Sequence, residues 1–396
     1  MKFTVSLQDF QKVLQKVLPA IPRKSTLPIL EHLHFSLTGD TLKIIATDQD
    51  ITIMSLLNVS GSADGSILVP GHKIGAIGKV LDAVGTLEFN ANIETKDINL
   101  ITATGKYNMK GIAADEYLDI PELFESEKPN VEITDGLIKI LIDKTHASFF
   151  KKSEIVRLAS KTFIAVSNDE FRPAMNGVLF QFRESYINAV ATDSFRLVKI
   201  VLKSEEKAFP KDLDIIVPTR TVDLLRKADD DVILSIIENR NRPTHVRIDV
   251  GDTVFITRLI DEKFPPYESV IPQNNEIKVL VTQKDLATAI QRVSIFTSEN
   301  SNQIRMSIDK NSILLFGEDE ETGSQGNETI DCDYKGKKFD VGFNYKYLLD
   351  AVQNIDTTAD NPKLFLTFSE PTRPVLVKPN TEVEDLLMLI MPVRIS

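Results

Sequence analysis

MKFTVSLQDFQKVLQKV, residues 1–17, joins a short alternating strand to a serine suited to cap a helix and then to apolar residues at helical spacing. The outline recurs as VEITDGLIKILIDKT (131–145) and as IKVLVTQKDLATAIQRV (277–293), in which Thr134 and Thr282 take the place of the serine. Three copies of one strand–helix phrase predict a chain of three similar units.

A second strand–turn–helix phrase follows each copy. The three examples are SILVPGHKIGAIGKVLDAV (66–84), LDIIVPTRTVDLLRKA (213–228) and FDVGFNYKYLLDAV (339–352). Alternating runs typical of β-strands separate the two phrases in every copy, as in FSLTGDTLKIIATD (35–48). Each unit is therefore expected to hold two helices and several strands, which is an α+β composition.

The length of the chain agrees with this division, because 396 residues suffice for about two to four ordinary domains. Polar, proline-bearing stretches suited to linkers occur at FESEKPN (124–130) and ESVIPQNNE (268–276). The predicted domains are 1–125, 126–272 and 273–396.

The middle unit is expected to be longer than its neighbours. The predicted caps of its two helices lie 84 residues apart, against 64 in the first unit and 62 in the third. We therefore predict an insertion of about 20 residues near 148–166. This stretch brings Lys151, Lys152, Arg157 and Lys161, so it either lengthens a basic helix or forms a basic surface loop.

Composition excludes several classes of protein. With 42% hydrophobic and 26% charged residues the chain is typical of soluble globular proteins, and its longest apolar run, LLMLIM (386–391), is too short to span a bilayer. The N-terminus lacks the apolar segment of a signal peptide, and the single cysteine, Cys332, cannot form an internal disulfide. We expect a cytoplasmic protein that does not bind a membrane.

The net charge of −11 argues against nucleic acid, but the distribution of charge does not. The predicted helices carry 16 Lys and Arg against 7 Asp and Glu. Their ranges are 6–18, 71–83, 136–161, 219–228, 282–293 and 344–353. If the helices share one face, that face is positive and the rest of the protein is strongly negative. The alternative is that lysine is simply a good helix former on any solvated face.

Signatures of catalysis or metal binding are weak. His32 and His34 share a strand face, but no third ligand is placed to complete a metal site. GHKIGAIGKV (71–80) fails the phosphate-loop pattern, because Lys73 replaces its first glycine and Val80 its final Ser or Thr. We predict no catalytic residue, no cofactor and no metal. The alternative is a hydrolytic or ligand-binding enzyme on repeated α+β domains.

Six motifs along the whole chain resemble one family. They are MKFTV (1–5), STLPIL (25–30), ATDSFRL (191–197), VPTR (217–220), KFPPY (263–267) and MPVR (391–394). Together and in this order they resemble the bacterial DNA polymerase sliding clamp, the beta subunit of the replicative DNA polymerase III holoenzyme. Six collinear matches are far more specific than any one of them.

The resemblance implies an α+β fold of three similar clamp-type domains, each with two helices packed on antiparallel sheets. Two chains would join head to tail as a homodimeric ring around duplex DNA. The implied function is that of a processivity factor without catalytic activity. Its implied partners are double-stranded DNA of any sequence, the replicative polymerase catalytic subunit, the clamp loader, and other replication and repair proteins that offer short linear peptide motifs.

The resemblance also implies three sets of site residues. Those facing DNA are Arg23, Lys24, His72, Lys73, Arg220, Lys12, Lys79, Lys227, Arg292 and Lys346. Those of a partner-peptide pocket are Met175, Thr192, Phe195, Arg196, Leu197, Pro265, Val270, Pro374, Ile390, Met391, Pro392, Val393, Arg394 and Ile395. Those of the dimer interface are Tyr107 and Met109 against Ile295 and Phe296.

Two features depart from the family pattern. The chain ends with an additional residue, Ser396, after the Arg–aliphatic pair at which clamps of this family often end. It has Pro173 and Ala174 where some members have two aromatic residues. DNA contacts of the 168–174 loop are therefore not expected to carry over.

Overall fold

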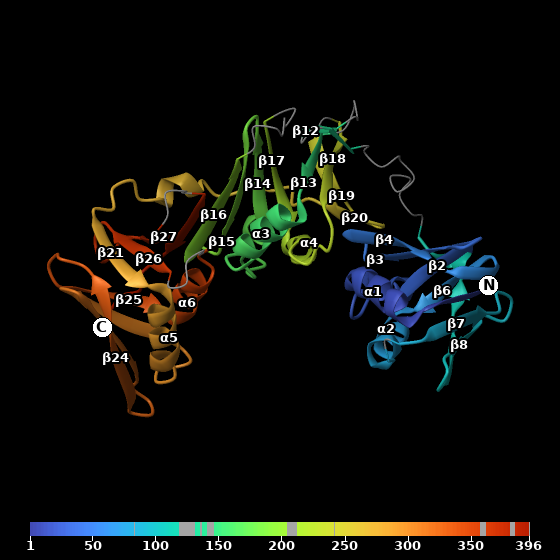
Figure 1. The fold of residues 1–396 in the computed structure, drawn as a ribbon, viewed down its shortest axis with the longest axis horizontal. Coiled ribbons are helices and arrows are strands. Elements are labelled where there is room, and N and C mark those ends of the chain that lie inside the picture. The colour runs from blue at the N-terminus through green and yellow to red at the C-terminus, as the bar shows by residue number, and fades with distance from the viewer. Residues whose placement is uncertain are drawn as a thin grey trace. The chain divides into compact units, whose positions relative to one another are not determined.

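The computed structural model describes residues 1–82, 84–118, 131–134, 137–140, 146–203, 212–240, 242–356, 362–380 and 385–395. The chain forms two compact units, Met1–Lys152 with Ala228–Leu259 and Ser153–Lys227 with Ile260–Ser396 (Figure 1). The expected linker at 124–130 and the additional Ser396 lie outside the described residues. Among the described residues no helix is both long and apolar enough to cross a membrane.

The first unit contains two antiparallel sheets. The smaller has the order β5 (Ser60–Ala63), β1 (Lys2–Ser6), β7 (Thr86–Ala91), β8 (Asp97–Ile101) and β9 (Lys106–Lys110). The larger has the order β10 (Ile112–Ala113), β6 (Gly65–Pro70), β2 (His32–Thr38), β3 (Thr41–Thr47), β4 (Ile51–Asn58), β20 (Thr253–Arg258), β19 (Arg242–Val250), β18 (Val232–Asn239) and β13 (His146–Phe150). A separate hairpin joins β11 (Val131–Thr134) to β12 (Leu137–Ile140).

Helices α1 (Leu7–Val17) and α2 (Gly71–Val80) pack against each other and against the sheets of this unit (Figure 1). The Ser6 hydroxyl accepts a hydrogen bond from the Asp9 backbone N–H and so caps α1, as predicted. The buried residues Phe10, Leu14 and Val17 recur at helical spacing and give α1 one apolar face. The opposite face of α1 is left for polar side chains.

The second unit is built on one long antiparallel sheet. Its order is β17 (Leu213–Pro218), β14 (Gly177–Arg183), β15 (Tyr186–Thr192), β16 (Arg196–Lys203), β28 (Leu386–Ile390), β27 (Val375–Pro379), β26 (Lys363–Phe368), β21 (Ile277–Thr282), β24 (Ser324–Asp333), β23 (Ser312–Asp319), β22 (Gln303–Asp309) and β25 (Phe339–Asn344). Its helices are α3 (Lys152–Phe163), α4 (Thr219–Leu225), α5 (Gln283–Ser294) and α6 (Tyr345–Gln353).

Short 3₁₀ helices complete the described structure of both units. They are η1 (Leu18–Ala20), η2 (Pro28–Glu31), η3 (Ala114–Glu116), η5 (Pro173–Met175) and η6 (Tyr267–Val270).

Two strand pairings explain why three repeats form two compact units. β4 of the first repeat pairs with β20 of the middle repeat, with Ser55 opposite Thr253. β16 of the middle repeat pairs with β28 of the last repeat, with Leu197 opposite Leu389. The middle repeat therefore divides its strands between two continuous sheets. The predicted α+β class, with helices on antiparallel sheets, is confirmed.

The predicted position of the middle helix is wrong in its first half. Residues 137–140 and 146–150, expected within a helix over 136–161, form β12 and β13. Thr134 is the last residue of β11 and pairs with Leu137, so it does not cap a helix. The segment LIKI carries two β-branched residues, which fit a strand as well as they fit an apolar helix face.

The repeated strand–helix phrase of the middle copy is β13 followed by α3, the equivalent of β1–α1 and β21–α5. The stretch 148–166, where an insertion was expected, therefore contains a helix that every copy has. Its buried residues Ile155, Leu158 and Ala159 make it part of the core. We infer that the additional residues of the middle copy precede β13.

Candidate nucleic-acid and partner interfaces

The first unit gathers four of the residues expected to face DNA. Arg23, Lys24, His72 and Lys73 are all exposed. The imidazole Nε2 of His72, in the first turn of α2, lies 3.1 Å from the backbone oxygen of Pro22. The loop that carries Arg23 and Lys24 is therefore held beside the start of α2. This arrangement forms one cationic surface from two distant sequence segments.

Lys12 and Lys79 lie on neighbouring parts of α1 and α2. The Gln11 side-chain amide donates hydrogen bonds of 2.8 Å to the backbone oxygens of Gly78 and Leu81, which tie α1 to the end of α2. Both lysines are exposed, although the Lys12 ammonium lies 3.7 Å from the Asp9 carboxylate. An exposed pair of this kind neutralises a cation only weakly.

The corresponding residues of the second unit are in mixed environments. Arg220 in α4 and Lys346 in α6 are exposed. Lys227 forms an ion pair of 2.6 Å with Asp223, and Arg292 one of 2.7 Å with Glu328. Carboxylates therefore compete with phosphate for Lys227 and Arg292.

Two of the cations predicted in the 148–166 stretch bind carboxylates of the last repeat. Arg157 forms ion pairs with Asp356 (2.7 Å) and Asp385 (2.8 Å), and Lys161 with Asp356 (2.6 Å). Burial alone would raise the pKa of Asp356, but the hydrogen bonds and charges of Lys161 and Arg157 outweigh it and lower that pKa. Neither cation forms part of a free basic loop.

Helical charge remains positive after this correction. The six α-helices that the structure describes carry eleven Lys and Arg side chains and five Asp and Glu side chains. The excess is smaller than the sequence predicted, because α3 begins only at Lys152 and α4 ends at Leu225, before Arg226 and Lys227.

The seam between β16 and β28 brings most of the predicted peptide pocket together. Arg196 lies opposite Ile390 across this seam, and the Met391 backbone N–H donates to the Phe195 carbonyl at 2.8 Å. Val375 pairs with Ile390 on the other side, which places Pro374 at the same end of the sheet. Residues almost 200 positions apart thus meet through backbone pairing.

An apolar cluster underlies this seam. Its buried members are Leu179, Val190, Leu197, Ile216, Phe264, Tyr267, Leu376 and Leu389. Phe264 and Tyr267 come from the segment that also holds Pro265 and Val270. The Tyr267 hydroxyl donates to the Gln181 side-chain oxygen at 2.7 Å, and burial raises the pKa of Tyr267 above its usual range. The tyrosine is therefore a fixed, neutral member of this cluster.

Apolar side chains remain exposed at the edge of this cluster. Phe195 is 58% exposed, Val270 48% and Met391 36%. Met175 is buried, and Ala174 beside it packs against the cluster. An apolar floor with exposed aromatic and aliphatic side chains at its rim is suited to binding a short apolar peptide.

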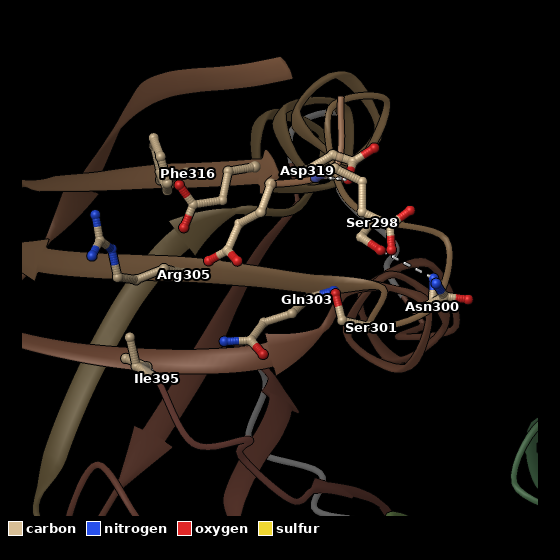
Figure 2. Close-up of a pocket in the computed structure, with 11 residues that line it drawn as sticks. Ser298, Asn300, Ser301, Gln303, Arg305, Phe316, Asp319 and Ile395 are labelled. Atoms are coloured by element: carbon tan, nitrogen blue, oxygen red, sulfur yellow. Dashed lines mark hydrogen bonds between the residues drawn. The ribbon is translucent and has the colours of Figure 1, made fainter. Parts of the chain in front are cut away.

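The end of the chain follows a different strand. The Val393 backbone N–H donates to the Gly342 carbonyl of β25 at 2.9 Å, and the Gln303 side chain donates to the Arg394 carbonyl at 3.2 Å. Ile395 lines a cavity of about 300 Å³ with Arg305 and Phe316 (Figure 2). Val393, Arg394 and Ile395 are therefore not members of the apolar cluster at the seam.

The predicted dimer residues occupy exposed edges. Tyr107 and Met109 lie on β9, which pairs with β8 alone within the described part of the chain. Ile295 is 77% exposed and Phe296 40% exposed at the end of α5. Phe296 lies over Gly326 of β24, where a Cβ atom would come within 2.4 Å of its ring. Most of β24 also lacks a partner on one side among the described residues, because β21 pairs with only two of its residues.

Sequence reasoning missed Tyr347 and Asp350 of α6. Both contact the turn at residues 192–196, which is called the pocket turn below. Phe195 stacks on the Tyr347 ring at 6.1 Å between centroids, and Arg196 forms an ion pair with Asp350. A carboxylate within the apolar helix sequence YKYLLDAV was the available signal. Within the described residues no group of three or more His, Cys, Asp or Glu side chains is placed to hold a metal ion.

Three family models match successive parts of the chain. They describe the N-terminal, central and C-terminal domains of the DNA polymerase III beta subunit and match residues 1–121, 150–266 and 268–394. The central match begins at the end of β13, in agreement with the inferred position of the repeat.

Curated relatives match over the whole length. The beta sliding clamp of Caulobacter vibrioides is 30% identical over 407 residues, and that of Bacillus subtilis 26% over 408 residues, each with 100% of both chains covered.

Solved structures share the fold. The DNA polymerase sliding clamp from Pseudomonas aeruginosa has a TM-score of 0.82 at 22% identity, and the sliding clamp of Bartonella birtlesii bound to griselimycin has 0.84 at 22%, both with 100% of each chain covered. The C. crescentus beta sliding clamp, solved with polyethylene glycol at a region named for beta-motif tethering, has 0.83 at 26%, with 100% of this chain and 99% of that chain covered.

Proposed function

Because the chain belongs to the family of bacterial beta sliding clamps, the beta subunit of DNA polymerase III, we infer that it is a DNA sliding clamp and not an enzyme. The observation that carries this inference is the match of all three domain models in order, with 30% identity to a beta sliding clamp across the whole of both chains. As a clamp it acts with DNA and with the polymerase that it makes processive.

The mechanism of a clamp is topological. A closed ring around the duplex cannot dissociate sideways, so tight contacts with DNA are unnecessary. Weak, screened attraction between exposed cations and phosphates keeps the duplex centred and still allows sliding. We propose that Arg23, Lys24, His72 and Lys73 make such contacts, because the structure gathers them on one exposed surface.

Arg220, Lys346, Lys12 and Lys79 are proposed as further phosphate contacts, since all four are exposed. Lys227 and Arg292 are proposed as weaker contributors, because their ion pairs with Asp223 and Glu328 must loosen before phosphate can bind. None of these side chains is expected to read bases, since contacts to phosphate carry no sequence information.

For protein partners we propose the exposed apolar edge of the β16–β28 seam. Its rim of Phe195, Val270 and Met391 over a buried apolar floor suits short peptide motifs with leucine and phenylalanine anchors. Two similar clamps have been solved with a bound molecule, the Bartonella clamp with griselimycin and the Caulobacter clamp with polyethylene glycol at a region named for beta-motif tethering. These complexes support the proposal that the present chain also binds ligands. The polymerase catalytic subunit, the clamp loader and other replication and repair proteins are the proposed partners.

For ring closure we propose that β9 of one copy lies beside the free edge of β24 of the other. Both strands have unpaired backbone groups along one side within the described residues, and such edges readily pair with another chain. Lys106 and Lys110 on β9 would face a strand that carries Glu328 and Asp331. Ile295 and Phe296 would then be covered by the partner chain.

The test combines two measurements on the full-length protein. Its mass in solution should be that of a dimer. Once a clamp loader has placed it on DNA, it should remain on circular DNA through a high-salt wash and leave the same DNA after linearisation, because a ring slides off an open end. Equal loss from both forms would contradict enclosure, and a monomer at micromolar concentration would contradict the ring.

A further inference from the structure

Ser194 lies at the centre of the pocket turn in a left-handed backbone conformation, with φ of 76°. Residues other than glycine rarely adopt this conformation, because their Cβ atom clashes with the backbone. The first repeat has the same turn, in which Gln49 has φ of 81°. Both turns are closed alike, since the Thr47 hydroxyl accepts the Gln49 N–H at 3.1 Å and the Thr192 hydroxyl accepts the Ser194 N–H at 3.2 Å.

The two turns differ in what the left-handed residue does with its side chain. The Ser194 hydroxyl accepts a hydrogen bond of 2.8 Å from Nη1 of Arg172, and it also donates to the Met175 sulfur at 3.7 Å. Gln49 is exposed, and the hydrogen bond described for it uses its backbone N–H. Both hydrogen-bonding capacities of the serine are thus used, and both partners belong to the loop 167–176.

This loop is compact within itself. The Ser167 N–H donates to the Met175 carbonyl at 3.0 Å, and the Arg172 N–H donates to the Asp169 carbonyl at 3.1 Å. The Asp169 carboxylate also accepts the Phe171 N–H at 3.0 Å. The loop is therefore held in shape by its own hydrogen bonds, and its position depends on the contacts at its end.

The end of the loop forms part of the pocket. Met175 is 5% exposed, and Ala174 packs against the cluster that contains Leu179, Leu197 and Leu389. The contacts of Ser194 thus link the exposed turn at the pocket rim to the buried floor below it. A shift of the loop would move Met175 and change the shape of the floor.

We propose that Ser194 is a positioning residue of the partner pocket, whose hydroxyl holds Arg172 and Met175 so that the floor is formed before a peptide binds. The proposal rests on the peptide-binding function proposed above. A site ordered in advance loses less conformational freedom on binding, and this raises its affinity. Ser194 itself need not touch the peptide.

The experiment measures the affinity of the full-length protein for a fluorescently labelled peptide with leucine and phenylalanine anchors, together with thermal stability. Ser194→Ala removes both hydrogen bonds and should weaken binding about 3- to 10-fold, the range expected for one or two hydrogen bonds. Ser194→Gly should weaken binding equally while leaving the melting temperature unchanged or higher, because glycine relieves the left-handed conformation. Gln49→Gly is the matched control and should leave peptide affinity unchanged.

A double-mutant cycle separates positioning from a general structural role. Arg172→Met and Ser194→Ala should each weaken binding, and the double variant should lose less than the sum of the two single losses, because both single variants remove the hydrogen bond between Arg172 and Ser194. Additive losses, or wild-type affinity in Ser194→Ala, would overturn the proposal. If the wild-type protein itself fails to bind the peptide, the peptide-binding function fails instead.

Discussion

The guanidinium carbon of Arg196 lies 4.5 Å from the centre of the Tyr347 ring. Arg196 begins β16 of the middle repeat, and Tyr347 lies in α6 of the last repeat. Asp350, one helical turn beyond Tyr347, accepts a hydrogen bond from the same guanidinium, and Phe195 stacks on the same tyrosine. Two repeats are thereby joined beside the pocket by a cation–π contact, an ion pair and an aromatic stack.

Asp350→Asn should weaken both the fold and the pocket. The change leaves the half-buried Arg196 with Asp193 as its one remaining carboxylate among the described residues. We expect a loss of about 1 kcal/mol in the free energy of unfolding, because the Asp350 side chain is partly solvated. Urea denaturation and peptide titration measure the two effects. Asp340→Asn, at an exposed position of β25, is the control, and equal losses in both variants would contradict this role.

Removing residues 391–396 should weaken peptide binding at least about a hundredfold. The Met391 backbone N–H donates a hydrogen bond to the Phe195 carbonyl at the pocket rim. Burial of two apolar anchors of a bound peptide is worth about 3–6 kcal/mol before the cost of ordering the peptide. Dimer formation should survive, because the proposed ring contact does not use the tail. Removing residues 394–396 alone should retain most of the binding, since Arg394 and Ile395 follow β22 and β25. Calorimetric titration of both truncations decides between these outcomes.

Replacing Ile295 and Phe296 together by alanine should favour monomers. Their exposed side chains would lose about 3–6 kcal/mol of burial per interface in the ring. Analytical ultracentrifugation from nanomolar to micromolar concentration measures the shift. Leu27→Ala, also an exposed apolar side chain, serves as the control. A double variant that stays dimeric at nanomolar concentration would place the interface elsewhere.

Neutralising Arg23, Lys24 and Lys73 should reduce the salt dependence of DNA binding. Each lost phosphate contact should lower the slope of log K against log salt by about 0.9, equally for every DNA sequence. Replacing Lys335, Lys337 and Lys338 by alanine removes the same charge from exposed positions outside the predicted surface. Fluorescence anisotropy at several salt concentrations compares the two triple variants. Equal slopes would show that net charge, and not this surface, governs binding.

His34 should make the stability of the first unit depend on pH. Its ring stacks on Tyr117 at 5.5 Å, and burial, with a smaller contribution from the charge of Lys43, lowers the pKa of His34. The folded state therefore favours neutral histidine. Its contribution to stability is present above the ordinary pKa of about 6.5 and is lost as pH falls towards the lowered value.

Urea midpoints at pH 7.5 and pH 5.5 measure this loss. His34→Phe keeps an aromatic ring at the position and should narrow the difference between the two midpoints. Tyr117→Phe keeps the ring that covers His34 and should preserve the difference. If His34→Phe leaves the pH dependence unaltered, acid sensitivity arises from other groups.

Local sequence patterns were sufficient for both ends of α1, α5 and α6 and for the first residues of α2 and α4, which end three residues before the ends of the predicted ranges 71–83 and 219–228. The predictions 6–18, 282–293 and 344–353 agree within one residue at each end with Leu7–Val17, Gln283–Ser294 and Tyr345–Gln353. Caps and apolar spacing act within a few residues, so a single sequence displays them. The middle repeat was misread because LIKI fits a strand and an apolar helix face equally well.

For the candidate surfaces too, some features follow from the sequence and others only from the structure. Exposed cations such as Lys24 and Lys73 follow from the sequence through the family resemblance, whereas the ion pairs of Arg157 and Lys161 with Asp356 do not. Those carboxylates come from another repeat. Which cations remain available to phosphate therefore depends on distant packing and cannot be counted from composition.

The sequence by itself determined the threefold repeat and the class of fold, because these depend on periodicity within short segments, whereas the expected site residues came from the resemblance to the clamp family. Only the tertiary structure decided that β4 pairs with β20, that β16 pairs with β28, and that Tyr347 and Asp350 hold the turn at Phe195 and Arg196. Strand register and side-chain contacts between distant segments arise from the simultaneous packing of the whole chain, and local sequence spacing does not specify them.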